Sequence, residues 1–206
     1  MFQRKCKITF ICHGATINSD ENRLSDNENY PPLNDAGQDE MEKICEWLKK
    51  RAIKNDRIYT SPSLRTIQSA QMVSKVFKKD IEILDCLHSR KRGAWSGLSY
   101  DQIECKFPQM LEQLHSNPCS FCPDGGETMT EFNKRVSKII KKIVDDNENN
   151  RVIIVTHPEI IQSAISKAVN LPAQNQNKLY IKTGSASQIS YFDGWASLMY
   201  SGQVPL

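Results

Sequence analysis

Short apolar runs recur along the chain at wide intervals. They are only about four residues long and are rich in β-branched side chains, which is typical of buried strands. The runs lie at residues 8–11, 57–60, 81–84 and 152–155. We therefore expect four strands separated by long connections.

Between these runs, apolar residues recur at spacings of three and four, the pattern of a helix packed on one face. Such stripes cover residues 41–48, 132–143 and 160–168. Asn34, a favourable N-cap residue, precedes the first stripe. Strands that alternate with helices predict an α/β fold with a mostly parallel sheet.

Length and composition limit the class of protein. The chain has 206 residues, no long linker and no repeat, so we expect one domain over 1–206, with an insertion at about 89–123. A net charge of +3 is too small to predict nucleic-acid binding. No apolar stretch is long enough to cross a bilayer or to form a signal peptide, so we expect a cytoplasmic protein without membrane association. We expect a monomer or a homodimer.

Three side chains suited to phosphate chemistry follow predicted strands. His13 and His157 come directly after the runs at 8–11 and 152–155, and Arg65 comes shortly after the run at 57–60. The carboxyl ends of parallel strands are where α/β folds bind ligands. A neutral imidazole can attack phosphorus, while a second histidine and an arginine can donate to the phosphoryl oxygens. A single histidine after a strand would fit an ordinary loop residue that bonds to a backbone carbonyl. Two histidines at equivalent positions, together with an arginine, favour a catalytic role.

Several blocks of sequence support this interpretation. They are ITFICHGAT at 8–16, PLNDAG at 32–37, TSPSLRTIQSA at 60–70, GAWSGL at 93–98, GETMTEFNKRV at 126–136 and VIIVTH at 152–157. In this order they resemble the motifs of the histidine phosphatase, or phosphoglycerate mutase-like, family. The resemblance covers nearly the whole chain.

The resemblance implies both a fold and a reaction. The fold would be a three-layer central sheet flanked by helices, with the insertion capping the site. His13 matches the family's phosphorylated nucleophile, Arg65 its phosphate-binding arginine and His157 its second histidine. Asn18 or Ser19 lies at the position of a phosphate-contacting asparagine. The reaction would act on a small phosphorylated substrate and would need no metal or cofactor.

The chain departs from the family pattern at two important positions. Cys12 stands where the family has a phosphate-binding arginine, and a missing preorganised donor typically costs on the order of 10²- to 10³-fold in rate. Ser89 stands at the usual glutamate proton donor, whose loss typically costs roughly 10²- to 10⁴-fold. The second loss matters most for substrates with poor leaving groups.

Nearby residues offer partial replacements. His88 is a candidate proton donor, because an imidazole titrates near neutral pH, and it also fits an ordinary loop histidine. The basic run at 90–92 either restores positive charge at the site or forms solvated surface.

Two functions therefore remain open. In one, the protein is a phosphatase with a weakened or altered site; in the other, it is an impaired family member that binds a phosphorylated ligand or a protein partner. We favour catalysis because His13, Arg65 and His157 are all present.

The cysteines suggest a further alternative. Seven is an odd number and excludes a complete disulfide framework. Cys119 and Cys122 form a CxxC that, with His115 and Cys105, could be imagined as a zinc site. A single CxxC beside prolines instead favours a turn with a reversible disulfide or free thiols. Cys12 beside His13 makes a poor thiol–imidazole pair, since adjacent residues of an extended segment point to opposite faces.

Overall fold

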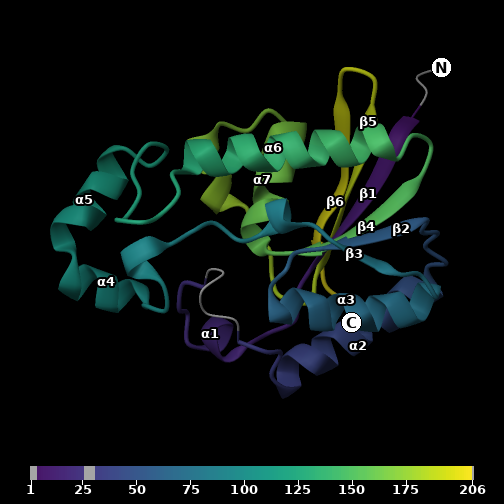
Figure 1. Cartoon of the computed structure of the whole chain (residues 1–206), viewed down its shortest axis with the longest axis horizontal. Coiled ribbons are helices and arrows are strands. Elements are labelled where there is room, and N and C mark those ends of the chain that lie inside the picture. The colour runs from purple at the N-terminus through teal and green to yellow at the C-terminus, as the bar shows by residue number, and fades with distance from the viewer. Residues whose placement is uncertain (1–3, 26–30, 206) are drawn as a thin grey trace.

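A six-stranded sheet in the order β3-β2-β4-β1-β5-β6 forms the centre of the molecule (Figure 1). The protein was studied as a computed structural model, which describes residues 4–25 and 31–205. The strands are β1 (Arg4–Cys12), β2 (Arg57–Thr60), β3 (Ile81–Ile83), β4 (Arg151–Thr156), β5 (Ala186–Phe192) and β6 (Ala196–Gln203). β3, β2, β4 and β1 are parallel, whereas β5 runs antiparallel to β1 and β6 antiparallel to β5. The expected mostly parallel α/β sheet is confirmed.

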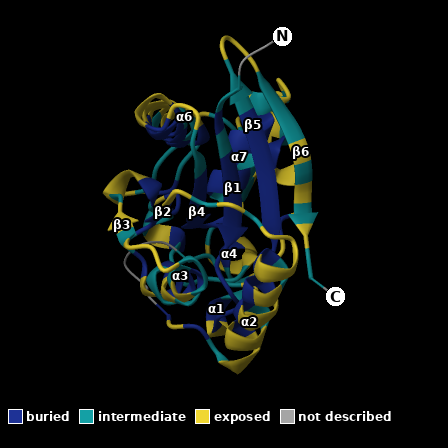
Figure 2. Cartoon of the chain, turned by 90° about the vertical axis from the view of Figure 1, so that its right-hand side faces the viewer, coloured by how far each residue is buried: buried dark blue, intermediate teal, exposed yellow. Residues whose placement is uncertain are grey.

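Helices cover both faces of the sheet and complete the three expected layers. α2 (Asp35–Lys50) and α3 (Leu64–Phe77) pack on one face, and α6 (Met129–Asp146) and α7 (Pro158–Ala168) pack on the other (Figure 1). The shorter helices are α1 (Ile17–Asp20), α4 (Tyr100–Lys106) and α5 (Pro108–Ser116), with 3-10 turns η1 (Asp85–Leu87), η2 (Gly93–Trp95) and η3 (Ala173–Lys178). Figure 2 shows the central strands buried between the helical layers.

The apolar pattern of the central strands explains the two layers. In β1, Ile8 and Phe10 point into the core beneath α6 and α7, and Ile11 points to the side of α2 and α3. In β4, Val152 and Ile153 divide in the same way. Successive side chains of a strand point to opposite faces, so a strand covered on both faces must be apolar throughout. Burial of each such side chain contributes about 1.5–3 kcal/mol.

The chain between β3 and α6 lies beyond the carboxyl ends of the parallel strands, where α4 and α5 project from the body (Figure 1). We call residues 84–128 the cap segment; it contains the insertion expected at 89–123. Arg135 of α6 fastens its start and end, because it pairs with Glu127 at 2.7 Å and donates to the carbonyl oxygens of Cys86 and His88. The cap is thereby anchored beside the strand ends.

Two glycines allow the loop after β1 to pack against the start of α2. A Cβ on Gly14 would lie 2.2 Å from the carbonyl oxygen of Gly37, and a Cβ on Gly37 would lie 2.1 Å from that of Ala15. Glu40 of α2 holds the same loop, since its carboxylate accepts from the Ala15 N–H at 2.9 Å and from the Thr183 hydroxyl at 3.1 Å. The residue before Gly14, His13, is consequently held in a fixed backbone frame.

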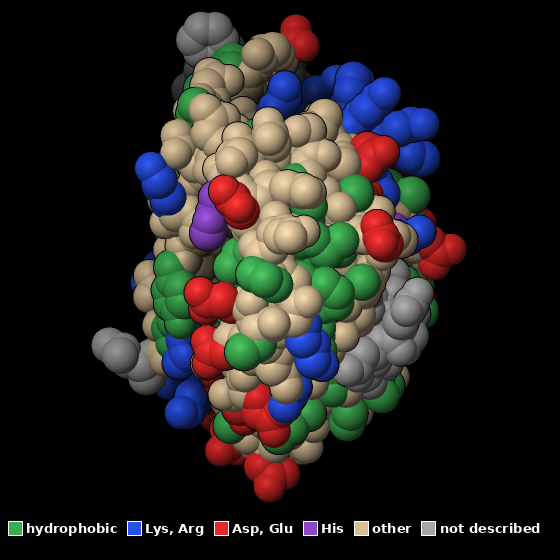
Figure 3. All heavy atoms as spheres, turned by 90° about the vertical axis from the view of Figure 1, so that its left-hand side faces the viewer, with side chains coloured by type: hydrophobic (Ala, Val, Ile, Leu, Met, Phe, Trp, Pro, Cys, Tyr) green, Lys and Arg blue, Asp and Glu red, His purple; other side chains and the backbone are tan. Residues whose placement is uncertain are grey.

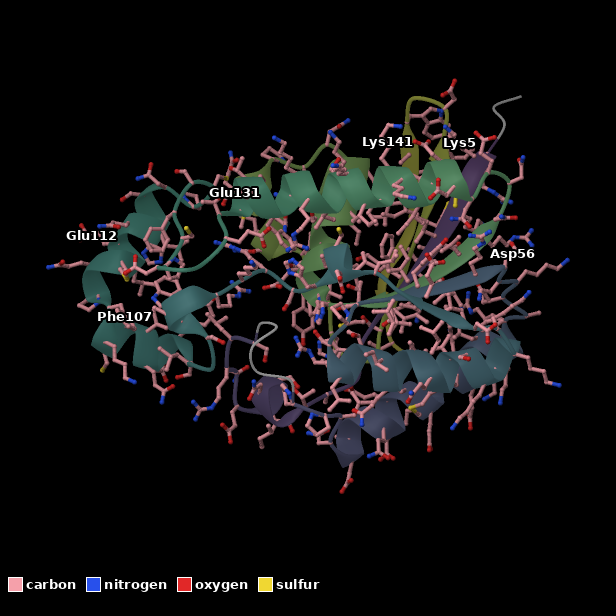
Figure 4. The ribbon with its side chains drawn as sticks, viewed as in Figure 1. Lys5, Asp56, Phe107, Glu112, Glu131 and Lys141 are labelled. Carbon is pink, nitrogen blue, oxygen red and sulfur yellow. The ribbon has the colours of Figure 1, made fainter. Side chains whose placement is uncertain are left out.

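The surface carries charges of both signs. The outer face of the cap mixes acidic, basic and hydrophobic side chains (Figure 3). At the other end of the molecule, Lys5 and Lys141 come together from β1 and α6 (Figure 4), and both pair with Asp145, at 2.9 and 2.5 Å.

Within residues 4–25 and 31–205, none of the helices has the length and apolar character needed to cross a membrane.

Candidate active site

The register of the sheet brings the two histidines together. Cys12 of β1 pairs with Thr156 of β4, so the next residue of each strand, His13 and His157, emerges at the same edge. Their ring centroids are 5.4 Å apart, with the rings at 69° to each other. The close approach follows directly from parallel pairing of adjacent strands.

Arg65 links the two rings. It lies in the first turn of α3 and is almost fully buried, at 2% exposure. Its Nε donates to His13 Nε2 at 3.3 Å, and its Nη2 lies 3.2 Å from His157 Nδ1. The three residues expected from the sequence to act together are therefore in contact, and a guanidinium at this point offers a fork suited to a phosphate.

The contacts of His13 define its tautomer. Its Nδ1 lies 2.8 Å from the carbonyl oxygen of Gly14, which can only accept, so Nδ1 carries the proton. The Nε2 atom then has the free electron pair that accepts from Arg65. Burial and the neighbouring Arg65 lower the pKa of His13 to about 3. His13 is thus a neutral imidazole with an available lone pair at pH 7.

His157 is fixed in the opposite tautomer. A guanidinium only donates, so His157 Nδ1 accepts from Arg65, and its Nε2–H donates to Ser61 Oγ at 2.8 Å. Ser61 directly follows β2, the strand on the other side of β4. Burial, followed by the charge of Arg65, lowers the pKa of His157 well below its usual value.

These two neutral histidines are expected to make folding sensitive to acid. Below pH 6.5 an unfolded chain protonates both rings, while folded His13 stays neutral until about pH 3. The unfolding free energy should therefore fall as the pH drops from 6.5 towards 3, by up to ~1.4 kcal/mol per pH unit for each histidine. Urea unfolding at pH 7, 5.5 and 4.5 measures this slope. His13→Gln should flatten it, the exposed-site variant His115→Gln should leave it unchanged, and equal slopes for all three proteins would contradict the assignment.

A cavity of about 660 Å³ opens above these residues. Its floor contains His13, Arg65 and His157, and the cap segment supplies much of its wall. The cap residues are Ser89, Arg90, Lys91, Arg92, Trp95, Tyr100, Leu114, His115, Pro118 and Pro123. A ligand bound above His13 and His157 would therefore be surrounded largely by the cap.

The two atypical positions are both buried. Cys12 belongs to the core beneath α6 and α7 and is not among the described residues that line the cavity. Burial raises the pKa of its thiol, so Cys12 brings no charge to the site. Ser89 does line the cavity, at 2% exposure, and its Oγ has no hydrogen-bond partner in the described part of the chain.

Of the other residues expected at the site, Ser19 lines the cavity, whereas Asn18 and His88 are not among the described residues that line it. Asn18 is buried and donates to Ser25 Oγ at 2.8 Å, whereas Ser19 lines the cavity but uses its hydroxyl to cap α1. His88 is half-buried, its Nδ1 lies 2.6 Å from the Ser89 carbonyl oxygen, and the described lining residues do not include it. Burial lowers the pKa of His88.

The basic run at 90–92 lines the cavity with all three residues. Arg90 is a structural cation, because its Nε donates to the Glu127 carbonyl oxygen at 2.8 Å and its Nη2 to that of Phe121 at 3.4 Å. Arg92 pairs with Glu159, a carboxylate of α7 that also accepts from the Arg90 N–H at 3.2 Å. Sequence reasoning missed Glu159; the signal was its place two residues after His157.

Among residues 4–25 and 31–205, no group of three or more histidine, cysteine or acidic side chains is arranged to hold a metal ion. The seven cysteines all lie in the described ranges and are free thiols in this structure. Cys119 and Cys122 are half-buried in the cap segment. A disulfide between them stays a prediction.

Comparison with known proteins identifies the family. The model of the histidine phosphatase superfamily (branch 1) matches residues 8–201, and the chain belongs to this superfamily. It is 26% identical over 190 residues to Phosphoglycerate mutase-like protein 4 of Arabidopsis thaliana, covering 91% of this chain and 80% of that protein. Three mycobacterial relatives are longer, and the chain spans 54% of each.

Solved structures show the same fold. YhfR of Bacillus stearothermophilus superimposes with a TM-score of 0.88 at 24% identity, over 97% of this chain and 98% of that one. A putative alpha-ribazole-5'-P phosphatase of Escherichia coli superimposes with a TM-score of 0.86 at 18% identity, over 98% of each chain. Family membership supports a phosphatase-type enzyme, and these neighbours show that the chain has the same fold.

Proposed function

We propose that the protein is a phosphomonoesterase that hydrolyses a small phosphorylated substrate through a phosphohistidine on His13. The observation that carries the proposal is the pairing of a neutral His13, whose Nε2 lone pair faces the Arg65 guanidinium, with His157 across the same guanidinium. Membership of a superfamily with phosphatase-named relatives supports it. The substrate's remaining atoms would lie in the cavity under the cap.

The proposed reaction uses His13 as the nucleophile and Arg65 as the cation that binds the phosphoryl group. His13 Nε2 attacks phosphorus, the bond to the leaving oxygen breaks, and water later attacks the phosphohistidine to release phosphate. Arg65 donates to the phosphoryl oxygens, where charge stabilisation usually supplies the largest part of the catalysis. The proposed steps use only side chains of this chain, with no metal or cofactor.

His157 needs one change before it can donate to the phosphate. In this structure its Nδ1 accepts from Arg65. A bound phosphate carries two negative charges, which draw the guanidinium towards themselves and favour protonation of the neighbouring imidazole. His157 then donates from Nδ1 while its Nε2–H stays on Ser61. Substrate binding is in this way coupled to proton uptake.

Phosphate release from a panel of phosphomonoesters tests the proposed function. The panel should contain aryl and alkyl phosphates together with an acyl phosphate, so that leaving groups of different quality are compared. At least one ester should be hydrolysed well above the rate without protein, and rapid acid-free quenching should trap a phosphorylated chain. Binding of phosphate esters without hydrolysis and without phosphorylated protein would instead identify the impaired, ligand-binding family member.

A further inference from the structure

The cavity holds a carboxylate that the sequence motifs do not account for. Among the described residues that line it, Glu159 is the only acidic one. The cap's own acidic side chains lie elsewhere; Glu112 of α5, for example, is exposed and points away from the body of the molecule (Figure 4). Any proton transfer by a carboxyl group among these lining residues therefore falls to Glu159.

Glu159 lies beside the position from which the proton donor is missing. Its Oε2 accepts from the backbone N–H of Arg90, at 3.2 Å, and the residue before Arg90 is Ser89. Glu159 is also two residues after His157, in the first turn of α7. The Glu159 carboxylate thus lies next to the position of Ser89, but it comes from α7 and not from the cap segment. The Ser89 Oγ has no hydrogen-bond partner in the described part of the chain.

The geometry points to Glu159 as the residue that transfers the proton in this site, an assignment that rests on the proposed function. In the first step His13 Nε2 bonds to phosphorus, the phosphorus–oxygen bond to the leaving group breaks, and the leaving oxygen takes the proton of the Glu159 carboxyl. In the second step the Glu159 carboxylate takes a proton from water, whose oxygen bonds to phosphorus. The phosphorus–nitrogen bond then breaks and its electron pair returns to Nε2. The sum is one ester and one water converted to one alcohol and one phosphate.

The ion pair with Arg92 determines when Glu159 is protonated. The Arg92 guanidinium and the Arg90 N–H both contact the Glu159 carboxylate and favour its ionised form. Lys91 and Arg65 add positive charge to the same cavity, while His13 and His157 are neutral. A bound phosphate dianion competes for Arg92 and repels the carboxylate, and both effects favour uptake of a proton. The substrate itself then produces the acid form that it needs.

Single-turnover kinetics of Glu159→Gln test the assignment. Glutamine keeps the size of the side chain and its acceptor for the Arg90 N–H but cannot transfer a proton. Phosphorylation by an alkyl phosphate should slow by roughly 10²- to 10⁴-fold, whereas phosphorylation by p-nitrophenyl phosphate, whose leaving group needs little protonation, should slow by less than about 10-fold. With the second step impaired, the phosphorylated protein should accumulate. Glu112→Gln, outside the cavity, is the matched control and should behave as the wild type.

Three results overturn the assignment. If Glu159→Gln slows both esters by the same factor, the residue acts only through structure; if it slows neither, the proton moves elsewhere. If the wild-type protein forms no phosphohistidine with any ester, the proposed function fails as well, which separates that failure from the first two. Should Glu159→Gln not fold, Glu159→Ala removes the carboxyl group, and an equal loss of rate for the alkyl and the p-nitrophenyl ester would then overturn the assignment.

Discussion

Substitution of His13 by alanine is expected to lower phosphate release by at least about 10³-fold and to eliminate the phosphorylated form of the protein. Two contacts orient the His13 imidazole: its Nδ1–H donates to the Gly14 carbonyl oxygen, and its Nε2 faces Arg65. Burial lowers the pKa of His13 to about 3, which keeps the ring neutral and its Nε2 lone pair available. The neighbouring histidine, His157, cannot take its place without moving, because the His157 ring is already bonded to Ser61.

Initial rates with the best ester of the panel, together with the mass of the quenched protein, measure this loss. Glu112→Ala is the control, since it removes an exposed side chain of α5 that does not line the cavity. We expect the control to keep its activity and its phosphohistidine. Equal rates for His13→Ala and the wild type would exclude the covalent mechanism and, with it, the proposed nucleophile.

Replacement of Arg65 by glutamine is expected to lower kcat/KM by roughly 10²- to 10³-fold, the usual cost of one preorganised charged donor. Arg65 is in direct contact with both histidines. Because Cys12 stands where the family has a second arginine, the loss of Arg65 is not compensated from that position. Its charge also lowers the pKa of each ring. Arg65→Gln should therefore raise both histidine pKa values as it removes activity.

NMR titration of the histidine ring protons and steady-state kinetics test the two effects in one variant. Arg65→Lys provides the comparison, because lysine retains the charge but not the planar fork that contacts both rings. We expect it to retain the low histidine pKa values and to recover only part of the activity. If Arg65→Gln loses less than about 10-fold in kcat/KM, another donor carries the phosphoryl charge.

The part of the fold predicted from sequence is the part with a continuous apolar pattern. β1 and β4 are buried on both faces and therefore stand out as apolar runs. β5 was missed because it buries polar side chains, which the pattern does not identify as core. Gln188 of that strand is satisfied by Thr9 across the sheet, at 2.9 Å, and such a partner is visible only after the chain has folded.

The same distinction applies to the site. His13, His157 and Arg65 could be placed together because the end of a strand predicts where the next residue lies. Glu159 could not, since its role depends on how α7 faces Arg92, from which Glu159 is separated by 66 residues of sequence, a relation that no local motif encodes. Phosphate contact by Asn18 stays a prediction; in this structure its side-chain amide donates to Ser25.

The cap segment has a consequence for how this molecule can diversify. The proposed reacting groups are His13 and His157, which follow β1 and β4, and Arg65 in the first turn of α3, whereas one uninterrupted stretch, residues 84–128, builds much of the cavity wall. A single gene segment could therefore be exchanged between related chains at its two anchor points beside Arg135. Such a recombination would change the wall of the cavity while leaving the strand ends that carry His13 and His157 intact.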